Sequence, residues 1–425
     1  MIKKIIVLAT LLVTISSFSQ KNNISPYSFF GIGQINETKT VTEKSMGIGT
    51  AISSSYKLNF SNPASLSELK FTTYTLGGEN IYTKIDDGIN KQSSSAFNIS
   101  YLALGFPVGK KSGVMIGLQP FSQVGYSIKQ SYKNEDDETE SNLYQGNGKT
   151  NRVFLGYGQK LPYNTSIGVE ASYTFGTLER NILWRNEDRI DQLASYYLTD
   201  TKIGGYAFKF GLQNNFKVSK NLDVKSGITV LLENKLNYEG NENLKSIYNS
   251  PNVDIIRPTG DETYNRDFTG DITMPLKTSL SIGVGKGNEW FAGLEYDFQN
   301  ATSFSTNFTQ NNNDVKYINA TNLAFGGFYT PKAESITKYW ERITYSAGVH
   351  TKQTGLEINN TSINDFGMSF GVSLPSKRQL SNINLGFDIG KRGEINNNGL
   401  VKENYYNFRL SLSLNDKWFR KRKLD

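Results

Sequence analysis

Apolar residues alternate with small or polar residues over many short stretches of the sequence, and this period of two constrains the fold more than any other feature. From residue 366 to 374 every second residue is apolar, and the residues between them are glycine or serine. The pattern returns at 383–389 and at 406–414. Because successive side chains of a strand face opposite sides of a sheet, each stretch should form a strand with one apolar face. The sequence therefore predicts an all-β protein.

Connection lengths distinguish a β-sandwich from a closed transmembrane barrel. Short connections, such as 109–112 and 161–164, alternate with long ones, such as 130–148 and 239–269. A sandwich has no reason for this alternation, whereas an outer-membrane barrel has short periplasmic turns and long external loops. We therefore predict a transmembrane antiparallel β-barrel of about 14 strands with both termini in the periplasm. The candidate strands are 71–83, 95–107, 112–129, 149–160, 165–182, 203–217, 222–238, 270–285, 289–301, 320–329, 341–352, 365–374, 382–390 and 404–415.

The composition also fits a barrel better than a layered soluble core. Hydrophobic residues make up 37% of the chain and aromatic residues 12%. Barrels place aromatic side chains in girdles at both membrane interfaces. From the alternation we expect these aromatic residues on the lipid-facing side: Tyr101, Tyr126, Tyr157, Tyr173, Trp290, Tyr296, Phe298, Tyr345, Phe387 and Tyr406.

The opposite face of the strands should line the lumen, and charges of both signs fall on it. An ion-selective porin is expected to concentrate one sign of charge at its constriction. Mixed signs instead favour pairing across a narrow, largely filled interior. His350 also falls on this face, where we expect a lumen residue rather than a catalytic one. The predicted lumen-lining residues are Arg152, Phe154, Glu170, Lys209, Lys225, Lys277, Phe291, Glu295, Asp297, Asp388 and Arg409.

The N-terminus predicts export. Lys3 and Lys4 precede an apolar run over 5–15, and small residues follow it, as in a signal peptide. No later stretch reaches ~18 consecutive apolar residues, which a membrane helix needs. We therefore expect the cell outer membrane as the location and its lipids as partners. The expected parts are a signal peptide at 1–20, an N-terminal plug or hatch at 21–70, the barrel at 71–419 and a basic periplasmic tail at 420–425.

The segment 21–70 is too ordered in character for a linker and too short for an independent domain. The interior of the barrel is the simplest place for it, and a periplasmic arm is the alternative. Residues 330–342 also depart from the pattern, because they are longer than the other short connections. Thr330 and Pro331 could begin a short helix there, and a longer turn fits equally well.

The residues available for catalysis are few. The chain contains no cysteine and one histidine, which excludes disulfides, thiolate chemistry and any site with two histidine ligands. The net charge of +7 is weak for 425 residues, so we expect no nucleic-acid partner. The acidic run at 135–138 could attract calcium, but such a run is typical of a solvated loop. We predict a protein that is not an enzyme and that has no cofactor, metal or catalytic residue.

The stretch Asn62–Pro63–Ala64–Ser65–Leu66 stands just before the first candidate strand, after an apolar, glycine-rich segment. In this layout the mature chain resembles the FadL-type long-chain fatty-acid transporter superfamily and its non-transporting relatives, such as the PorV-type barrel of type IX secretion. The phrases at 365–371 and 414–419 also resemble features of this group. The resemblance implies an N-terminal hatch carrying Asn62, Pro63 and Ala64. For true transporters it also implies a hydrophobic path that leaves sideways at a kink in the third strand.

Pro120 lies in the middle of the third candidate strand. Proline cannot donate to the ladder, so it weakens pairing with one neighbour. Its position makes Pro120 the candidate for a lateral gate, and a bulge without function is the alternative. At the C-terminus, Trp418 and Phe419 are candidates for the aromatic signal recognised during barrel insertion.

Two functions are compatible with these features. The first is passive transport of a hydrophobic small molecule across the outer membrane, as in FadL. The second is a non-transporting, PorV-like barrel subunit of an outer-membrane secretion or assembly complex, with envelope proteins as partners. The mixed lumen charges, the possible helix at 330–342 and the basic tail favour the second function. The resemblance to the FadL-type superfamily favours the first, which is the function we predict, with the second as the alternative.

Overall fold

The structure is a computed structural model that describes residues 25–250, 257–304, 314–335, 337–376, 381–395 and 400–417. In these ranges the chain forms a closed antiparallel barrel of 14 strands. Ten strands are continuous: β2 (Thr72–Asp86), β3 (Lys91–Val108), β4 (Ser112–Lys133), β5 (Thr139–Lys160), β6 (Thr165–Asn186), β7 (Leu193–Ser219), β16 (Thr344–Ile358), β17 (Thr361–Pro375), β18 (Asn382–Arg392) and β19 (Lys402–Asp416). Four are interrupted: β8 (Leu222–Leu231) with β9 (Asn234–Tyr248), β10 (Pro258–Met274) with β11 (Lys277–Lys286), β12 (Trp290–Gln299) with β13 (Ser303–Phe304), and β14 (Val315–Tyr317) with β15 (Ala320–Tyr329).

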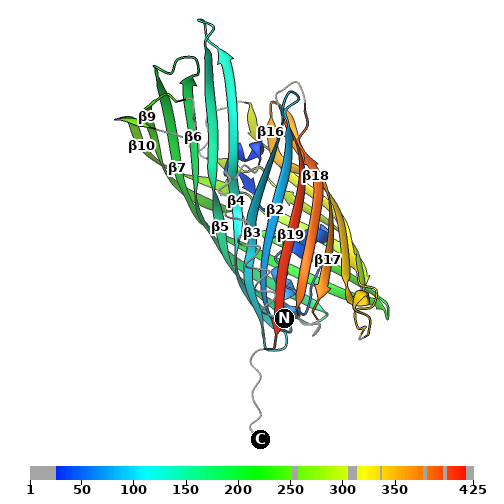
Figure 1. The fold of residues 1–425 in the computed structure, drawn as a ribbon. Coiled ribbons are helices and arrows are strands. Elements are labelled where there is room, and N and C mark those ends of the chain that lie inside the picture. The colour runs from blue at the N-terminus through cyan, green and yellow to red at the C-terminus, as the bar shows by residue number, and fades with distance from the viewer. Residues whose placement is uncertain are drawn as a thin grey trace, which may run out of the picture.

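The barrel closes between its last and first strands. β19 pairs with β2 from Lys402↔Asp86 to Asp416↔Thr72, and the tilted strands follow one another around the wall in chain order (Figure 1). Closure gives the backbone groups of the first and last strands a partner, which lipid cannot supply. The predicted 14-strand antiparallel barrel is confirmed.

Side chains alternate across the wall as the period of two predicts. On β17, Phe366, Met368 and Phe370 are 41%, 42% and 49% exposed, whereas Asp365 and Ser369 are buried. The exposed apolar face is the one that a membrane barrel presents to lipid, and the polar face is turned to the interior. Among the helices in the described ranges, none combines the length and the apolar character needed to cross a membrane.

The part of the wall that contains β4, β5, β6, β7, β9 and β10 extends beyond the rest of the barrel at one end, and we call this part the crown (Figure 1). Strands β4, β5 and β6 have 22 residues each, compared with 15 in each of the continuous strands β16, β17 and β19. Most of the expected long connection at 130–148 is therefore strand, because β4 runs to Lys133 and β5 begins at Thr139.

The described part of the N-terminal segment, drawn in blue, lies inside the barrel (Figure 1). It contains η1 (Pro26–Phe29), β1 (Gln34–Ile35), α2 (Val41–Met46) and η2 (Pro63–Glu68). Thr40 and Glu43 form a capping box at the start of α2. Gly47 ends α2 with φ 74°, a conformation that favours glycine. The segment is therefore a series of short, capped turns rather than an extended arm.

The predicted lipid-facing position is wrong for two aromatic residues. Tyr101 and Tyr126 are 2% and 4% exposed and face the interior. Ser100 has no partner at the register shift between β2 and β3, and Phe121 has none at the shift between β4 and β5. Each bulge inserts one residue, which reverses the faces of all residues beyond it.

In the connection at 330–342, of which residue 336 lies outside the described residues, 331–334 form a turn and Tyr339–Arg342 form the 3-10 helix η3. The longer turn therefore fits the described part better than an α-helix. The signal peptide at 1–20, Trp418, Phe419 and the tail at 420–425 lie outside the described residues.

Candidate functional site

The barrel wall contains a seam between β3 and β4. The two strands pair from Val108↔Ser112 only as far as Leu102↔Leu118. Beyond that point β3 remains paired with β2, and β4 with β5. The bulges in β3 and β4 lie where their mutual pairing ends. The gate candidate Pro120 therefore stands at the start of the seam, and its role as a gate stays a prediction.

The N-terminal segment occupies part of the free edge of β4. Strand β1 pairs with β4 at Gln34↔Gln123 and Ile35↔Ser122. The backbone N–H of Asn36 donates to the carbonyl oxygen of Phe121 at 2.8 Å. On the other side of the seam, Gln123 Nε2 donates to Asn98 Oδ1 of β3 at 3.2 Å. A short strand and one side-chain hydrogen bond thus replace the missing ladder.

A cavity of about 290 Å³ lies between the N-terminal segment and the barrel wall. Phe30, Ile32 and Ile35 line it from the segment, and Phe121 lines it from the start of the seam. Ligand sites are mostly apolar clefts with a few polar groups, and this cavity has that character. Other barrel residues around it are Leu231, Met274, Phe298, Tyr317, Leu356, Ile363, Arg152, Lys277 and Arg392.

The predicted hatch motif fixes the N-terminal segment to strands β6 and β7. Asn62 is fully buried, and its Nδ2 donates to the carbonyl oxygens of Thr50 and Leu212 at 2.9 and 3.0 Å. Its Oδ1 accepts the backbone N–H of Ala64 at 3.0 Å and so caps η2. A Cβ at Gly211 would lie 2.0 Å from Asn62 Oδ1. Glycine is therefore required there for the motif to approach the wall.

Buried ion pairs also hold the segment to the barrel. Lys39 Nζ lies 2.9 Å from Glu295 Oε1, and the backbone N–H groups of Gly49 and Thr50 donate to Glu295 Oε2 at 2.8 and 2.7 Å. Burial alone would lower the pKa of Lys39, but the carboxylates of Glu295 and Glu37 outweigh it and raise that pKa above its ordinary value. The predicted lumen residue Glu295 therefore acts as an anchor for the segment.

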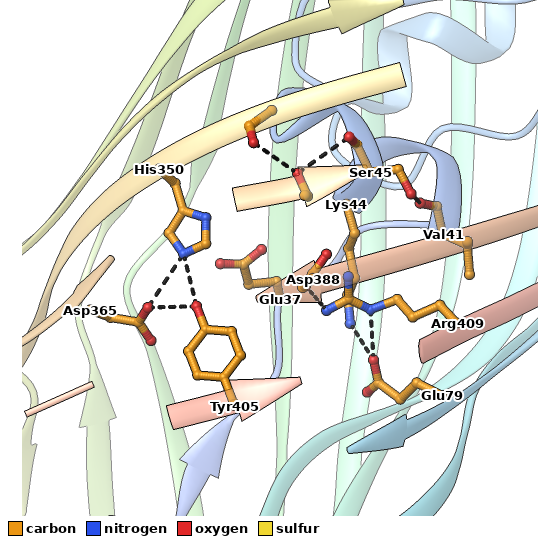
Figure 2. Close-up of polar contacts among 12 residues, drawn as sticks. Glu37, Val41, Lys44, Ser45, Glu79, His350, Asp365, Asp388, Tyr405 and Arg409 are labelled. Carbon is orange, nitrogen blue, oxygen red and sulfur yellow. Dashed lines mark hydrogen bonds and ion pairs between the residues drawn. The ribbon is translucent and has the colours of Figure 1, made fainter. Parts of the chain in front are cut away.

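Helix α2 is anchored in the same way. Lys44 Nζ donates to Glu79 Oε2 at 3.1 Å, and Arg409 Nε donates to the same oxygen at 3.0 Å. Arg409 also pairs with Asp388. Figure 2 shows Lys44 and Arg409 converging on Glu79. The predicted lumen residues Arg409 and Asp388 thus belong to a network that includes the N-terminal segment.

His350 belongs to a neighbouring polar group that lines a cavity of about 120 Å³ (Figure 2). Tyr405 Oη donates to Asp365 Oδ1 at 2.8 Å, and His350 Nε2 lies 3.4 Å from that oxygen. Arg392 pairs with Asp365 Oδ2 at 2.9 Å. These side chains satisfy one another, which is typical of a structural network inside a protein.

Three further predicted lumen residues form one buried triad. Glu170 Oε1 accepts hydrogen bonds from Arg152 Nη1 at 3.0 Å and from Lys209 Nζ at 3.2 Å. Lys209 also donates to the carbonyl oxygen of Phe60 at 2.7 Å, which ties the triad to the N-terminal segment. Phe154 packs under the Arg152 guanidinium, 4.9 Å from ring centroid to charge.

Replacing Glu170 by alanine is expected to destabilise the folded protein. The change leaves Arg152 and Lys209 buried without their carboxylate, and breaking a buried pair in this way costs about 3–5 kcal/mol. Urea unfolding of the full chain in lipid should show the loss. Asp271→Ala is the matched control, because it breaks the exposed pair with Lys235 and should cost less than about 1 kcal/mol. Equal losses in both variants would contradict the prediction.

The remaining predicted lumen residues lie on β8, β11 and β12. Lys225 Nζ is 5.7 Å from the centre of the Phe291 ring. Asp297 Oδ2 accepts a hydrogen bond from Asn322 at 3.0 Å, and Lys277 lines the cavity of about 290 Å³. Whether these side chains contact a solute stays a prediction. In the described part of the chain, no group of three or more His, Asp or Glu side chains is placed to hold a metal ion.

The partners that the N-terminal segment supplies, namely Glu37, Lys39 and Lys44, were not predicted from the sequence. One signal was present, because Thr40 and Glu43 have the spacing of a capping box. That motif would have placed a helix in the segment and Lys44 on it.

Comparison with known proteins gives both a family and a fold. The family model described as BamG matches residues 1–425, and no curated protein matches the sequence at a significant level. Among solved structures, the chain is similar to the CymD monoaromatic hydrocarbon channel, with 14% identity and a TM-score of 0.59 over 90% of this chain and 99% of that chain.

Two further solved structures have the same fold. A FadL homologue from Pseudomonas aeruginosa is 13% identical, with a TM-score of 0.56 over 89% of this chain and 99% of that chain. The toluene transporter TodX from Pseudomonas putida is 14% identical, with a TM-score of 0.54 over 89% of this chain and 98% of that chain. At these identities the likeness establishes the fold, which is that of a FadL-type outer-membrane barrel.

Proposed function

The chain belongs to the BamG family, and from this premise and the FadL-type barrel we propose that it is a passive outer-membrane channel for a hydrophobic compound. The observation that carries the proposal is the cavity of about 290 Å³, whose lining includes Phe121 at the start of the β3–β4 seam. A compound bound there is adjacent to the one place where β3 and β4 are not paired to each other. The crown would lie outside the cell, and both termini would lie in the periplasm.

The role of each part follows from its chemistry. The cavity would hold the apolar body of the compound, and the seam at Pro120 would release it sideways into the membrane. In lipid an unpaired backbone group costs on the order of several kcal/mol unless protein or ligand covers it. Strand β1 covers part of the free edge of β4, so release requires a local displacement of Gln34 and Ile35.

A second candidate function is a non-transporting, PorV-like subunit of an outer-membrane assembly or secretion complex. The family name BamG is consistent with an assembly role. The buried ion pairs of Lys39 and Lys44 also favour it, because they fix the N-terminal segment to the wall. A non-transporting barrel does not require its N-terminal segment to move.

Affinity purification of the full chain from native outer membranes separates the two functions. A monomer that carries a co-purified hydrophobic compound is the result expected for a channel. A stoichiometric set of envelope proteins would favour the subunit function. Uptake of radiolabelled toluene by cells with and without the protein is the complementary measurement, in a strain that lacks other barrels of this type.

A further inference from the structure

A second interruption of the barrel wall lies across the barrel from the seam in the order of the strands. Residues 232–233 face 275–276 without ladder pairing. Residues 274–276 likewise face 300–302 without pairing. We call this level of the wall the Pro275 break. Pro275 has no backbone N–H to donate, which suits it to a position where the ladder is open.

The Pro275 break lies where the outer face of the barrel changes from apolar to polar. On one side of it, Leu280 and Ile282 of β11 are 45% and 58% exposed. On the other side, the exposed outer face carries the ion pair of Lys235 with Asp271. An apolar outer band marks the hydrocarbon core of the membrane. The break is therefore at the boundary between membrane and water on the crown side.

This position explains how an open ladder is tolerated. Inside hydrocarbon an unpaired backbone N–H or C=O has no partner, whereas at the boundary water can supply one. The break can persist without a strand to cover it. The β3–β4 seam, by contrast, has β1 on its free edge.

The cavity of about 290 Å³ extends to the break, because Met274, Pro275 and Thr302 line it. Phe298 lies on the outer face of β12, in phase with Leu294 and Tyr296, which are 48% and 42% exposed. Phe298 nevertheless lines the cavity, and so does the exposed Asn300. Pro275, Asn300 and Thr302, which belong to the two unpaired stretches of the break, also line the cavity, so the cavity extends to the open part of the ladder.

We propose that the Pro275 break is a second opening of the cavity, through which a hydrophobic compound enters from the outer membrane–water boundary. This inference rests on the proposed transport function and adds an entrance to it, with the β3–β4 seam as the exit. The mouth combines the apolar side chains of Met274 and Phe298 with the polar side chains of Asn300 and Thr302. Such a mouth suits a small molecule with an apolar body and at most a weakly polar group.

Blocking the mouth tests the entrance. The chain has no cysteine, so Asn300→Cys can be modified selectively in intact cells with a bulky, membrane-impermeant maleimide. The initial rate of radiolabelled toluene uptake should fall several-fold after modification. Lys133→Cys, modified in the same way at the exposed end of β4, is the matched control and should leave the rate unchanged. If cells take up toluene through the Asn300→Cys protein at the same rate before and after modification, the proposed entrance is overturned.

A labelling experiment tests the opening without transport. Leu231 lines the cavity, and Leu231→Cys should react with a small charged methanethiosulfonate added outside the cells. Adding Asn300→Trp should slow that reaction by about an order of magnitude, and an unchanged reaction rate would overturn the opening. If the unmodified protein adds no toluene uptake over cells that lack it, the proposed transport function fails. The labelling rates then still decide whether the cavity opens at the break.

Discussion

Deleting residues 21–69 is expected to leave a barrel that inserts into membranes but conducts small solutes. The described part of this segment packs inside the barrel, where Phe60 and Leu66 are 0% and 1% exposed, and leaves cavities of about 290 and 120 Å³. Apart from β1, which pairs with β4 at two positions, the closed ladder from β2 to β19 is made without the segment. Because barrel strands satisfy their backbone groups with one another, folding should not require the segment. Single-channel conductance in planar bilayers should rise by an order of magnitude or more over that of the full chain.

A second variant distinguishes a lumen that has lost the segment from a lumen in which the segment is held less tightly. Lys39→Met combined with Lys44→Met removes two of the ion pairs between segment and wall but keeps the segment in place. This variant should conduct only in brief openings, whereas the deletion should conduct steadily. Unchanged conductance after deletion would mean that other groups block the lumen.

The strands could be predicted from the sequence because their physical cause is local. A strand in a barrel wall has lipid on one side and a polar interior on the other, so every residue carries information about its face. On β17 this information was sufficient, since Phe366, Met368 and Phe370 are exposed as the alternation predicts. The extent of the strands was underestimated at the crown, because outside the membrane the outer face no longer has to be apolar.

The two wrong face assignments arose at bulges, because no pattern in the sequence marks the position of a bulge. A bulge at Ser100 or Phe121 inserts one residue and reverses the faces beyond it. The alternation was continued across these bulges, so Tyr101 and Tyr126 were assigned to the outer face of the wall instead of the inner face. The position of Pro120 within β4 could be predicted, but the end of β3–β4 pairing beside it depends on partners far apart in the sequence.

The lumen residues show the same division between local and non-local information. Alternation placed Glu170, Arg409 and Glu295 on the inner face. It could not identify their partners, because Lys39 and Lys44 come from a segment without periodicity. The composition of such a segment indicates order, but only its contacts show which wall residues hold it.

Closing the β3–β4 seam is expected to reduce uptake of a hydrophobic compound by an order of magnitude or more. The side chains of Asn98 and Gln123 meet across the seam at 3.2 Å. A disulfide between cysteines at these positions needs their Cβ atoms about 3.5–4.5 Å apart, so its formation is scored first by a reductant-sensitive shift in gel mobility. Oxidised Asn98→Cys with Gln123→Cys should lose toluene uptake in intact cells, and a reductant should restore it. The absence of native cysteine leaves no competing thiol.

The matched control is a disulfide in the part of the same strand pair that is already closed. Leu104 and Ile116 are register partners below the seam, so Leu104→Cys with Ile116→Cys should leave uptake unchanged when oxidised. Pro120→Val tests the cause of the seam independently, because valine restores a backbone donor and is a good strand former. It should reduce uptake less than the disulfide, since the bulge at Phe121 remains. If the Asn98–Gln123 disulfide forms and uptake is unchanged, the compound does not pass the seam, and the non-transporting function gains support.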